Sequence, residues 1–168
     1  MITLHAIEPG EWPLYRDLRL QALAESPDAF GSTLEAEAGR ADEAWSSRIA
    51  TLAAGQDQAF FARHNEAVCG LVWCKLAAQE PERADLYQMW VAPASRGQGA
   101  GRALLDGAIA WAAAQGAKCL CLGVTVGDTP AMHLYRSVGF RPSGPVEPLR
   151  EGSRLTSQPM ALRLDAAR

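Results

Sequence analysis

The sequence lacks the features of membrane, secreted and nucleic-acid-binding proteins. None of its apolar runs is long enough to span a bilayer. The opening residues, MITLHAIEPGEW, lack the basic segment and long apolar segment of a secretory signal, so we expect a cytoplasmic protein with no membrane partner. The 16 basic and 19 acidic residues give a net charge of −3, which predicts no general nucleic-acid-binding surface.

Metal-binding and disulfide patterns are also missing. The four cysteines lie in apolar, strand-like segments, and their spacing fits neither a disulfide framework nor a Cys-x-x-Cys metal knuckle. They are Cys69, Cys74, Cys119 and Cys121. The three histidines are scattered along the chain. We therefore expect free, buried cysteines and no metal site.

The bulk composition is that of one ordinary globular domain. Of the 168 residues, 48% are hydrophobic and 21% are charged, and no linker or internal repeat divides the chain. We predict a single domain over residues 1–168. The richness in alanine and glycine indicates a bacterial, GC-rich source.

Hydrophobic periodicity predicts one mixed sheet with helices packed on it, an α/β (mixed α+β) fold. The expected strands are 2–7, 58–64, 67–77, 86–91, 118–126, 140–142 and 155–164. The expected helices are 11–24, 33–52 with a break at Gly39, 102–115, and a last one that is capped by Asp128 or Thr129 and ends at Gly139. Asn65-Glu66 should join a hairpin, and residues 86–126 should form a right-handed parallel crossover. In the first helix, one face is formed by Trp12, Tyr15, Leu18, Arg19, Ala22 and Leu23.

A glycine-dense turn, RGQGAG, separates the strand that ends at Val91 from the following helix. A helix N-terminus offers unpaired N–H groups to anions, and Gly97, Gly99 and Gly101 have no Cβ atom to keep a phosphate away. Arg96 can donate two hydrogen bonds to phosphate oxygens, and Arg102 also adds positive charge. These features predict a pyrophosphate pocket. A plain turn that needs positive φ angles explains the same six residues equally well.

Two other phosphate-binding turns fit poorly. RGQGAG lacks the Gly-Lys-Ser/Thr ending of a P-loop. It also lacks the glycine spacing of a dinucleotide fold, and the strand-like segment 119–126 contains no carboxylate for a ribose.

Two motifs resemble those of the GNAT superfamily of N-acetyltransferases. The family pattern Q/R-x-x-G-x-G/A is matched by Arg96 to Gly101 and is preceded by WVAP. A second pattern, N-x-x-A-x-x-L-Y-x-x-x-G-F, is matched by DTPAMHLYRSVGF from Asp128 to Phe140, except that Asp128 replaces the usual Asn. The final MALRL resembles the last strand of the family, and the element order agrees along nearly the whole chain.

The resemblance implies a mostly antiparallel sheet with one splayed parallel strand pair, and acetyl-CoA as co-substrate without a metal. The pantetheine arm would lie between the splayed strands, and the pyrophosphate would lie on the glycine turn. The implied cofactor-binding residues are Met89, Trp90, Val91, Arg96, Gly97, Gln98, Gly99, Ala100, Gly101, Arg102, Asp128 and Tyr135. An ionised aspartate at 128 donates no hydrogen bond, which leaves the ligand role of that position open.

The resemblance also implies direct acetyl transfer to a primary amine, with Tyr135 protonating the departing CoA thiolate. Water or a carboxylate would deprotonate the amine. Asp85 is the best-placed carboxylate, and Glu80 and Glu82 are alternatives that would act through water. The acceptor pocket is expected at Phe30, Gly31, Ser32 and Tyr87, with Thr33 and Trp73 nearby.

Other functions remain open at this point. The domain could bind acyl-CoA as a sensor or partner subunit without turnover, or it could be a different nucleotide-phosphate enzyme. The acceptor could be a polyamine, an amino acid, an antibiotic or a protein amine. The resemblance also leaves a homodimer open.

Overall fold

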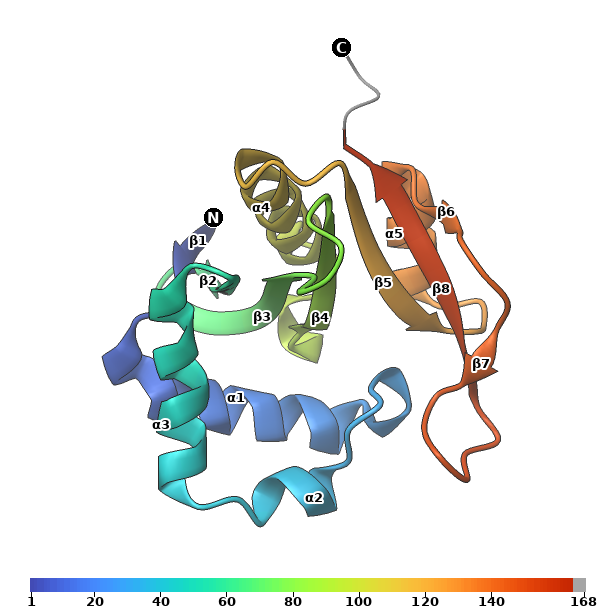
Figure 1. Ribbon diagram of the computed structural model, residues 1–168. Helices are drawn as coiled ribbons and strands as arrows, with labels where there is room; N and C mark the ends of the chain where they lie inside the picture. The colour runs from blue at the N-terminus through green and yellow to red at the C-terminus, as the bar shows by residue number, and fades with distance from the viewer. Residues whose placement is uncertain (165–168) are drawn as a thin grey trace.

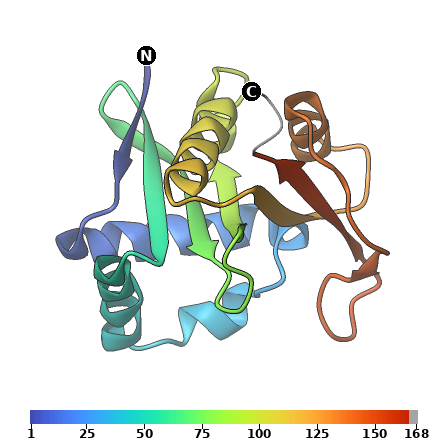
Figure 2. The ribbon, with the colours of Figure 1, turned by 45° about the horizontal axis from the view of Figure 1, so that its top comes forward.

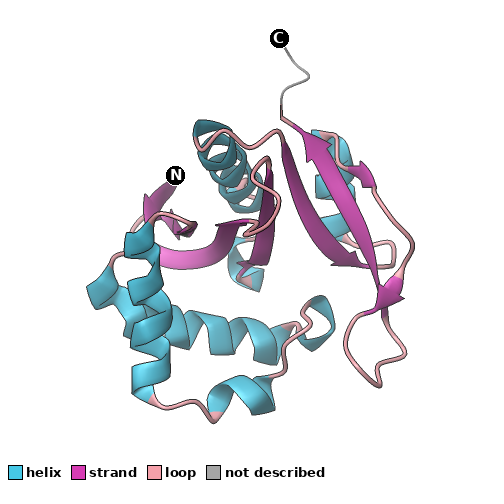
Figure 3. Ribbon diagram, in the orientation of Figure 1, coloured by secondary structure: helices cyan, strands magenta, loops and turns pink. Residues whose placement is uncertain are grey.

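The computed structural model describes residues 1–164, in which eight strands form one sheet (Figures 1 and 3). The strand order is β1-β2-β3-β4-β5-β8-β6, and β7 also pairs with β8. The strands are β1 (Ile2–Ala6), β2 (Asp57–His64), β3 (Ala67–Leu76), β4 (Arg83–Val91), β5 (Cys119–Thr125), β6 (Arg141–Pro142), β7 (Glu147–Pro148) and β8 (Thr156–Arg163). The α-helices are α1 (Trp12–Glu25), α2 (Leu34–Ala38), α3 (Asp42–Ala50), α4 (Ala100–Ala114) and α5 (Pro130–Val138). The mixed α+β fold is therefore confirmed.

Helices cover both faces of the sheet (Figures 1 and 2). On one face, α1 and α3 bury Tyr15, Leu23, Trp45 and Ile49 in what we call the α1 core. On the other face, α4 and α5 build the α4 core, to which α4 contributes the buried residues Leu104, Leu105, Ala108 and Ala112. Each helix follows its apolar periodicity, because only one stripe of a surface helix can reach the sheet.

The predicted hairpin is confirmed as the antiparallel pair β2 and β3. Asn65, in the connecting turn, has φ 60°. Asparagine tolerates this left-handed conformation better than most residues, so local turn chemistry fixes the hairpin.

The predicted parallel pair is β4 and β5, and the two strands separate soon after they meet. They pair only from Arg83↔Cys119 to Asp85↔Cys121. Figure 1 shows them close together at the top of the view and apart below. β4 begins at Arg83 rather than at the expected Leu86, and these added residues make the parallel pairing.

Three sequence-based expectations need correction. The segment 33–52 is two helices: the expected break at Gly39 is present, and α3 then ends at Ala50. The two-residue strand β7 was not expected, because so short a segment has no periodicity to detect. Cys69 and Cys74 are buried as predicted, but Cys119 and Cys121 are only half-buried because they lie on the face of β5 opposite the α4 core.

Within residues 1–164, no helix combines the length and the apolar character needed to cross a membrane. The same residues contain no group of three or more His, Cys, Asp or Glu side chains placed to hold a metal ion.

Candidate functional site

A cavity of about 910 Å³ lies where β4 and β5 separate. Its walls come from both strands, from the segment 25–32 after α1, from α5, and from the segment 143–160 around β7 and β8. Along β5, Leu120, Leu122 and Val124 face the α4 core. Because side chains alternate along a strand, Cys121 and Gly123 face the opposite side. The cavity touches both sets and therefore passes from one face of the sheet to the other.

An irregularity in β4 borders this cavity. Gln88 has φ 60°, and the β3–β4 register shifts between Leu71 and Trp73. In that register neither Gln88 nor Met89 has a partner on β3, while β5 has already diverged. A non-glycine residue in this conformation costs roughly 1–3 kcal/mol and persists only where its surroundings hold it. One such contact is the Tyr15 hydroxyl, which donates to Gln88 Oε1 at 2.7 Å.

Tyr135, the expected proton donor, borders the cavity from α5. It is 6% exposed, and its ring packs edge-on against Phe140 with centroids 5.7 Å apart. Burial raises the Tyr135 pKa above its ordinary value, so the phenol stays protonated at neutral pH. No described residue hydrogen-bonds to the hydroxyl, so it is available to donate to a ligand.

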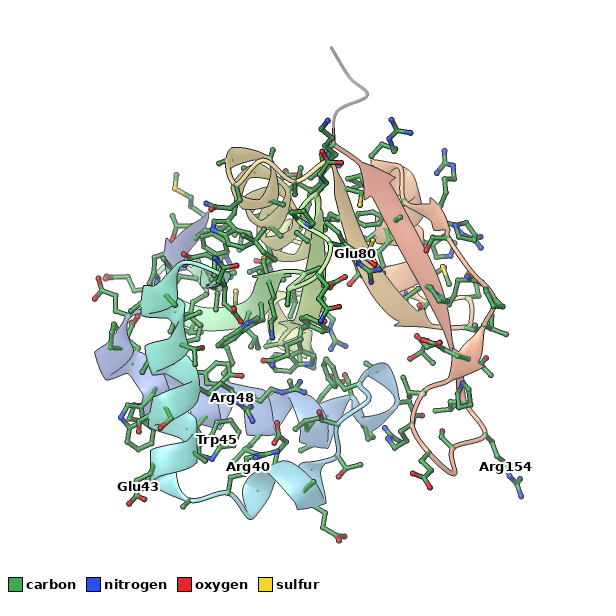
Figure 4. The ribbon with its side chains drawn as sticks, in the orientation of Figure 1. Arg40, Glu43, Trp45, Arg48, Glu80 and Arg154 are labelled. Carbon is green, nitrogen blue, oxygen red and sulfur yellow. The ribbon has the colours of Figure 1, made fainter. Side chains whose placement is uncertain are left out.

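Asp85, the expected base, lies at the closed end of the gap, where β4 and β5 still pair. Its carboxylate borders the cavity and accepts from Arg83 Nε at 2.9 Å. Glu80 and Glu82 are outside the cavity, where Glu80 pairs with Arg83 and Glu82 with Lys118 at 3.3 Å each. Glu80 lies in the loop before β4 (Figure 4). The structure therefore favours Asp85 over the other two carboxylates by position.

The expected acceptor residues Phe30, Gly31, Ser32 and Tyr87 all border the cavity. Thr33 and Trp73, which were expected nearby, make structural contacts instead. Thr33 caps α2 by accepting from Ala36 N at 3.2 Å. Trp73 is buried and donates from Nε1 to Asp57 Oδ2 at 2.7 Å.

The glycine turn forms an exposed backbone cradle beyond the end of β4. Gly97 and Gly99 have φ 79° and 92°, and a Cβ built on either meets no atom within 4 Å. Within the described chain, no N–H from Gly97 to Arg102 donates to another backbone group. Gly101 has a different role, because a Cβ there would lie 3.3 Å from Leu134 Cδ2 of α5. The turn itself does not border the cavity.

Arg96 does not project freely toward the turn. Its Nε donates to Val91 O at 2.9 Å and its Nη2 to Glu25 Oε1 at 2.7 Å. Glu25, at the end of α1, also accepts from the Ser26 hydroxyl and from Trp90 Nε1. Hydrogen bonds from Ser26, Trp90 and Arg96 lower the pKa of Glu25 to about 2. Arg96 therefore fastens the glycine turn to α1, so any phosphate contact from its side chain would compete with Glu25.

The other expected cofactor-binding residues differ in their position relative to the cavity. Met89 borders the cavity, whereas Trp90 is buried in the α1 core. Arg102 pairs with Asp106 at 3.0 Å on the surface of α4. Asp128 is exposed and pairs with His133, and Thr129 supplies the cap of α5 by accepting from Met132 N at 3.2 Å.

Sequence reasoning missed three residues at this site. The strained backbone of Gln88 has no sequence signal. Glu25 looks like an ordinary acidic residue near a helix end. Arg19 could have been found from its position, because an arginine among the apolar residues of one helix face is expected to be buried with them. In the structure Arg19 is buried on α1.

Known proteins are similar to this chain in sequence and in fold. Residues 18–140 match the Acetyltransferase (GNAT) family. Mycothiol acetyltransferase from Thermobispora bispora is 32% identical over 145 residues, which cover 83% of this chain and 46% of that protein. Streptothricin acetyltransferase from Streptomyces lavendulae is 34% identical over 127 residues, which cover 76% of this chain and 61% of that protein. The chain thus spans only about half to three fifths of these relatives.

A solved structure from Salmonella typhimurium, determined with its cofactor acetyl-CoA, superposes with a TM-score of 0.81. The superposition covers 98% of this chain and 95% of that one at 16% sequence identity, so it supports the fold alone. The matched span, the identity to acetyltransferases and the splayed strand pair agree, and the chain belongs to the GNAT acetyltransferase family.

Proposed function

We propose that this protein transfers the acetyl group of acetyl-CoA directly to a primary amine. The main support is the cavity between β4 and β5, which places Tyr135 at one side of the sheet and the segment 25–32 at the other. A donor and an acceptor that enter from opposite faces would meet in this gap. Holding two reactants in contact in this way lowers the entropic cost of their reaction.

The donor side fits a pantetheine arm that ends in a pyrophosphate. Beyond Asp85 the described part of β4 does not pair with β5, so its backbone on that side can hydrogen-bond to the arm, and the free N–H groups from Gly97 to Arg102 can hold the pyrophosphate. The acetyl-CoA in the Salmonella structure of the same fold agrees with this assignment.

The proposed chemistry depends on proton transfers at the amine and at the leaving thiolate. The neutral amine nitrogen attacks the thioester carbonyl, and the C–S bond of the tetrahedral intermediate then breaks. The nitrogen, which is positively charged after the attack, loses its extra proton to water. Tyr135 donates its proton to the leaving thiolate and is reprotonated from solvent. Since a lysine-like ammonium titrates near ~10.4, the amine must first lose its proton to water or to Asp85.

The relatives named for mycothiol and streptothricin favour a small-molecule acceptor, although this chain spans only part of each. A peptide amine remains compatible with the open cavity.

The deciding experiment is calorimetric titration with acetyl-CoA, ATP and NAD, followed by an amine screen that detects thiol release. We expect selective acetyl-CoA binding and turnover with at least one amine. Arg96→Ala should weaken acetyl-CoA binding, because the variant frees the glycine turn from Glu25. Binding without turnover of any amine would instead identify a sensor, and no acetyl-CoA binding by folded protein would end the proposal.

A further inference from the structure

Arg19 is a buried cation without hydrogen-bond partners at the edge of the cavity. The residue lies on α1, is 3% exposed and borders the same cavity as Tyr135. Its Nε and Nη1 atoms are buried and have no hydrogen-bond partner. Leaving a buried charged donor unpaired is costly, so such groups normally have a partner in the molecule or in a ligand.

The nearby carboxylate is already occupied. Glu37 is buried on α2 and accepts from Arg48 Nη1 at 3.1 Å and from Arg40 Nε. Burial alone would raise the Glu37 pKa, but the hydrogen bonds from Arg48 and Arg40 outweigh it and lower the pKa. In Figure 4, Arg48 extends from α3 toward α1, and Arg40 lies near α2. Glu37 therefore already has two arginine partners and forms no ion pair with Arg19.

Tyr15 does not supply the missing charge. Burial raises its pKa, so its phenol is neutral, and its hydroxyl donates to Gln88 rather than accepting from Arg19. Burial also lowers the pKa of Arg19, but a guanidinium remains protonated in proteins.

The Arg19 side chain is held in place by an aromatic ring. Its Cζ lies 4.6 Å from the centroid of the Phe30 ring, which also borders the cavity. This contact is a cation–π interaction, and the planar guanidinium can donate two parallel hydrogen bonds to a carboxylate.

We propose that Arg19 binds the carboxylate of the acceptor, so that the acetylated molecule is an amine that also has a carboxylate, as an amino acid does. This inference rests on the proposed acetyl transfer. Binding the carboxylate beside α1 would turn the amine toward the gap between β4 and β5, where Tyr135 lies. It would also supply the anion that the described residues do not provide for Arg19.

The test compares amino acids with their α-carboxamides, which keep the amine and side chain but lose the charge. We expect the wild-type protein to have a higher kcat/KM for the acid than for the amide. A hydrogen bond to a charged group contributes about 1.5–3 kcal/mol, so Arg19→Gln should lower kcat/KM for the acid about 10- to 100-fold and change the amide much less. Arg19→Lys, which keeps the charge, should restore part of the acid preference.

Arg16→Gln is the matched control. Arg16 is on the same helix but pairs with Asp17 at 3.0 Å and with Asp42 at 3.2 Å, away from the cavity lining. The Arg16→Gln variant should leave the ratio of kcat/KM for the acid to kcat/KM for the amide unchanged. Equal losses for acid and amide in Arg19→Gln, or no acid preference in wild type, would show that Arg19 only supports the packing.

A binding measurement separates this inference from the proposed function. N-acetyl amino acids and N-acetyl amino amides are titrated by calorimetry into protein saturated with CoA, which needs no turnover. Selective binding of the acid that is lost in Arg19→Gln supports the Arg19 site even if no amine is acetylated. Amine turnover with equal binding of acid and amide overturns the Arg19 site and leaves the acetyltransferase intact.

Discussion

Burial gives Tyr135 the protonation state that its proposed role needs. Tyr135 borders the cavity, yet its ring packs against Phe140 and the residue is 6% exposed. Desolvation disfavours the phenolate, and the raised pKa keeps a proton available to a leaving thiolate. Cys121 shows the same effect: burial raises its pKa to about 11, so its thiol is protonated at neutral pH and is a weak nucleophile.

Replacing Tyr135 with Phe should lower kcat about 10²-fold or more, because general acid catalysis contributes about 10²–10⁴-fold. The acetyl-CoA Kd should change little, since the ring and its contact with Phe140 remain. Steady-state kinetics and calorimetry measure the two effects separately. Unchanged kcat would remove Tyr135 from the mechanism.

The pH profile tests the same residue. The rate should rise with pH as the amine loses its proton. At pH values up to about 10 the rate should show no decline from loss of the Tyr135 proton, because burial moves the Tyr135 pKa upward from its ordinary value near 10. A decline in rate near pH 8 that is absent in Tyr135→Phe would contradict the raised pKa of Tyr135.

At the scale of the elements, close contact between β3 and β4 accompanies the irregularity at Gln88. A Cβ at Gly70 on β3 would lie 2.8 Å from Trp90 O, a backbone atom of β4. A Cβ at Gly107 on α4 would lie 2.7 Å from Leu4 Cδ1, the end of a side chain that can rotate. The two distances are alike, so the cost of adding a Cβ depends on whether the neighbouring atom can move. Trp90 O belongs to the backbone, whereas Leu4 Cδ1 can rotate away.

We expect Gly70→Ala to reduce the free energy of unfolding by about 1–3 kcal/mol, as overpacking does. Gly107→Ala is the matched control: its clash falls on a side-chain end that can rotate away, and the helix preference for alanine over glycine, about 0.8–1 kcal/mol, offsets what remains. Urea unfolding curves compare the two variants with wild type. Equal stability of Gly70→Ala and wild type would mean that β4 can shift away from β3.

At the scale of the whole molecule, the two sides of the cavity are tied across the gap by single side chains. Arg150, in the loop between β7 and β8, donates from Nη2 to Pro27 O at 2.8 Å and to Phe30 O at 2.7 Å. Thr125 Oγ1 of β5 donates to Asp28 O at 2.7 Å. These bonds hold the segment after α1, which contains the expected acceptor residues, against the opposite wall.

Arg150→Ala should raise the acceptor KM by about 10-fold or more, because the variant loses hydrogen bonds from a charged group to Pro27 O, Phe30 O and Gly31 O, and one such bond contributes about 1.5–3 kcal/mol. The acetyl-CoA Kd should stay within about twofold of the wild-type value, since Arg150 hydrogen-bonds to the segment 27–31 and not to the glycine turn. Arg154→Ala is the control, because Arg154 is exposed on the same loop and points away from the cavity (Figure 4). Equal effects of both variants would show that the loop acts only through its charge.

The sequence by itself determined the element order, the hairpin at Asn65 and the strand–turn–helix unit around RGQGAG. These features follow from side-chain periodicity and from the φ angles that glycine and asparagine permit, both of which are local. The motif ending in Gly139-Phe140 also pointed to Tyr135, and the structure places that residue in the cavity. Its chemical role remains a prediction.

Only the tertiary structure decided where β4 and β5 separate, how Gln88 is strained, and which partners the arginines have. Arg96 meets Glu25 across 71 positions of sequence, and the Tyr15 hydroxyl meets Gln88 across 73. No local pattern encodes such contacts, because they exist only after helices and strands pack. For the same reason, the sequence predicted a free Arg96 where the structure pairs it, and it could not show that Arg19 is buried without a partner.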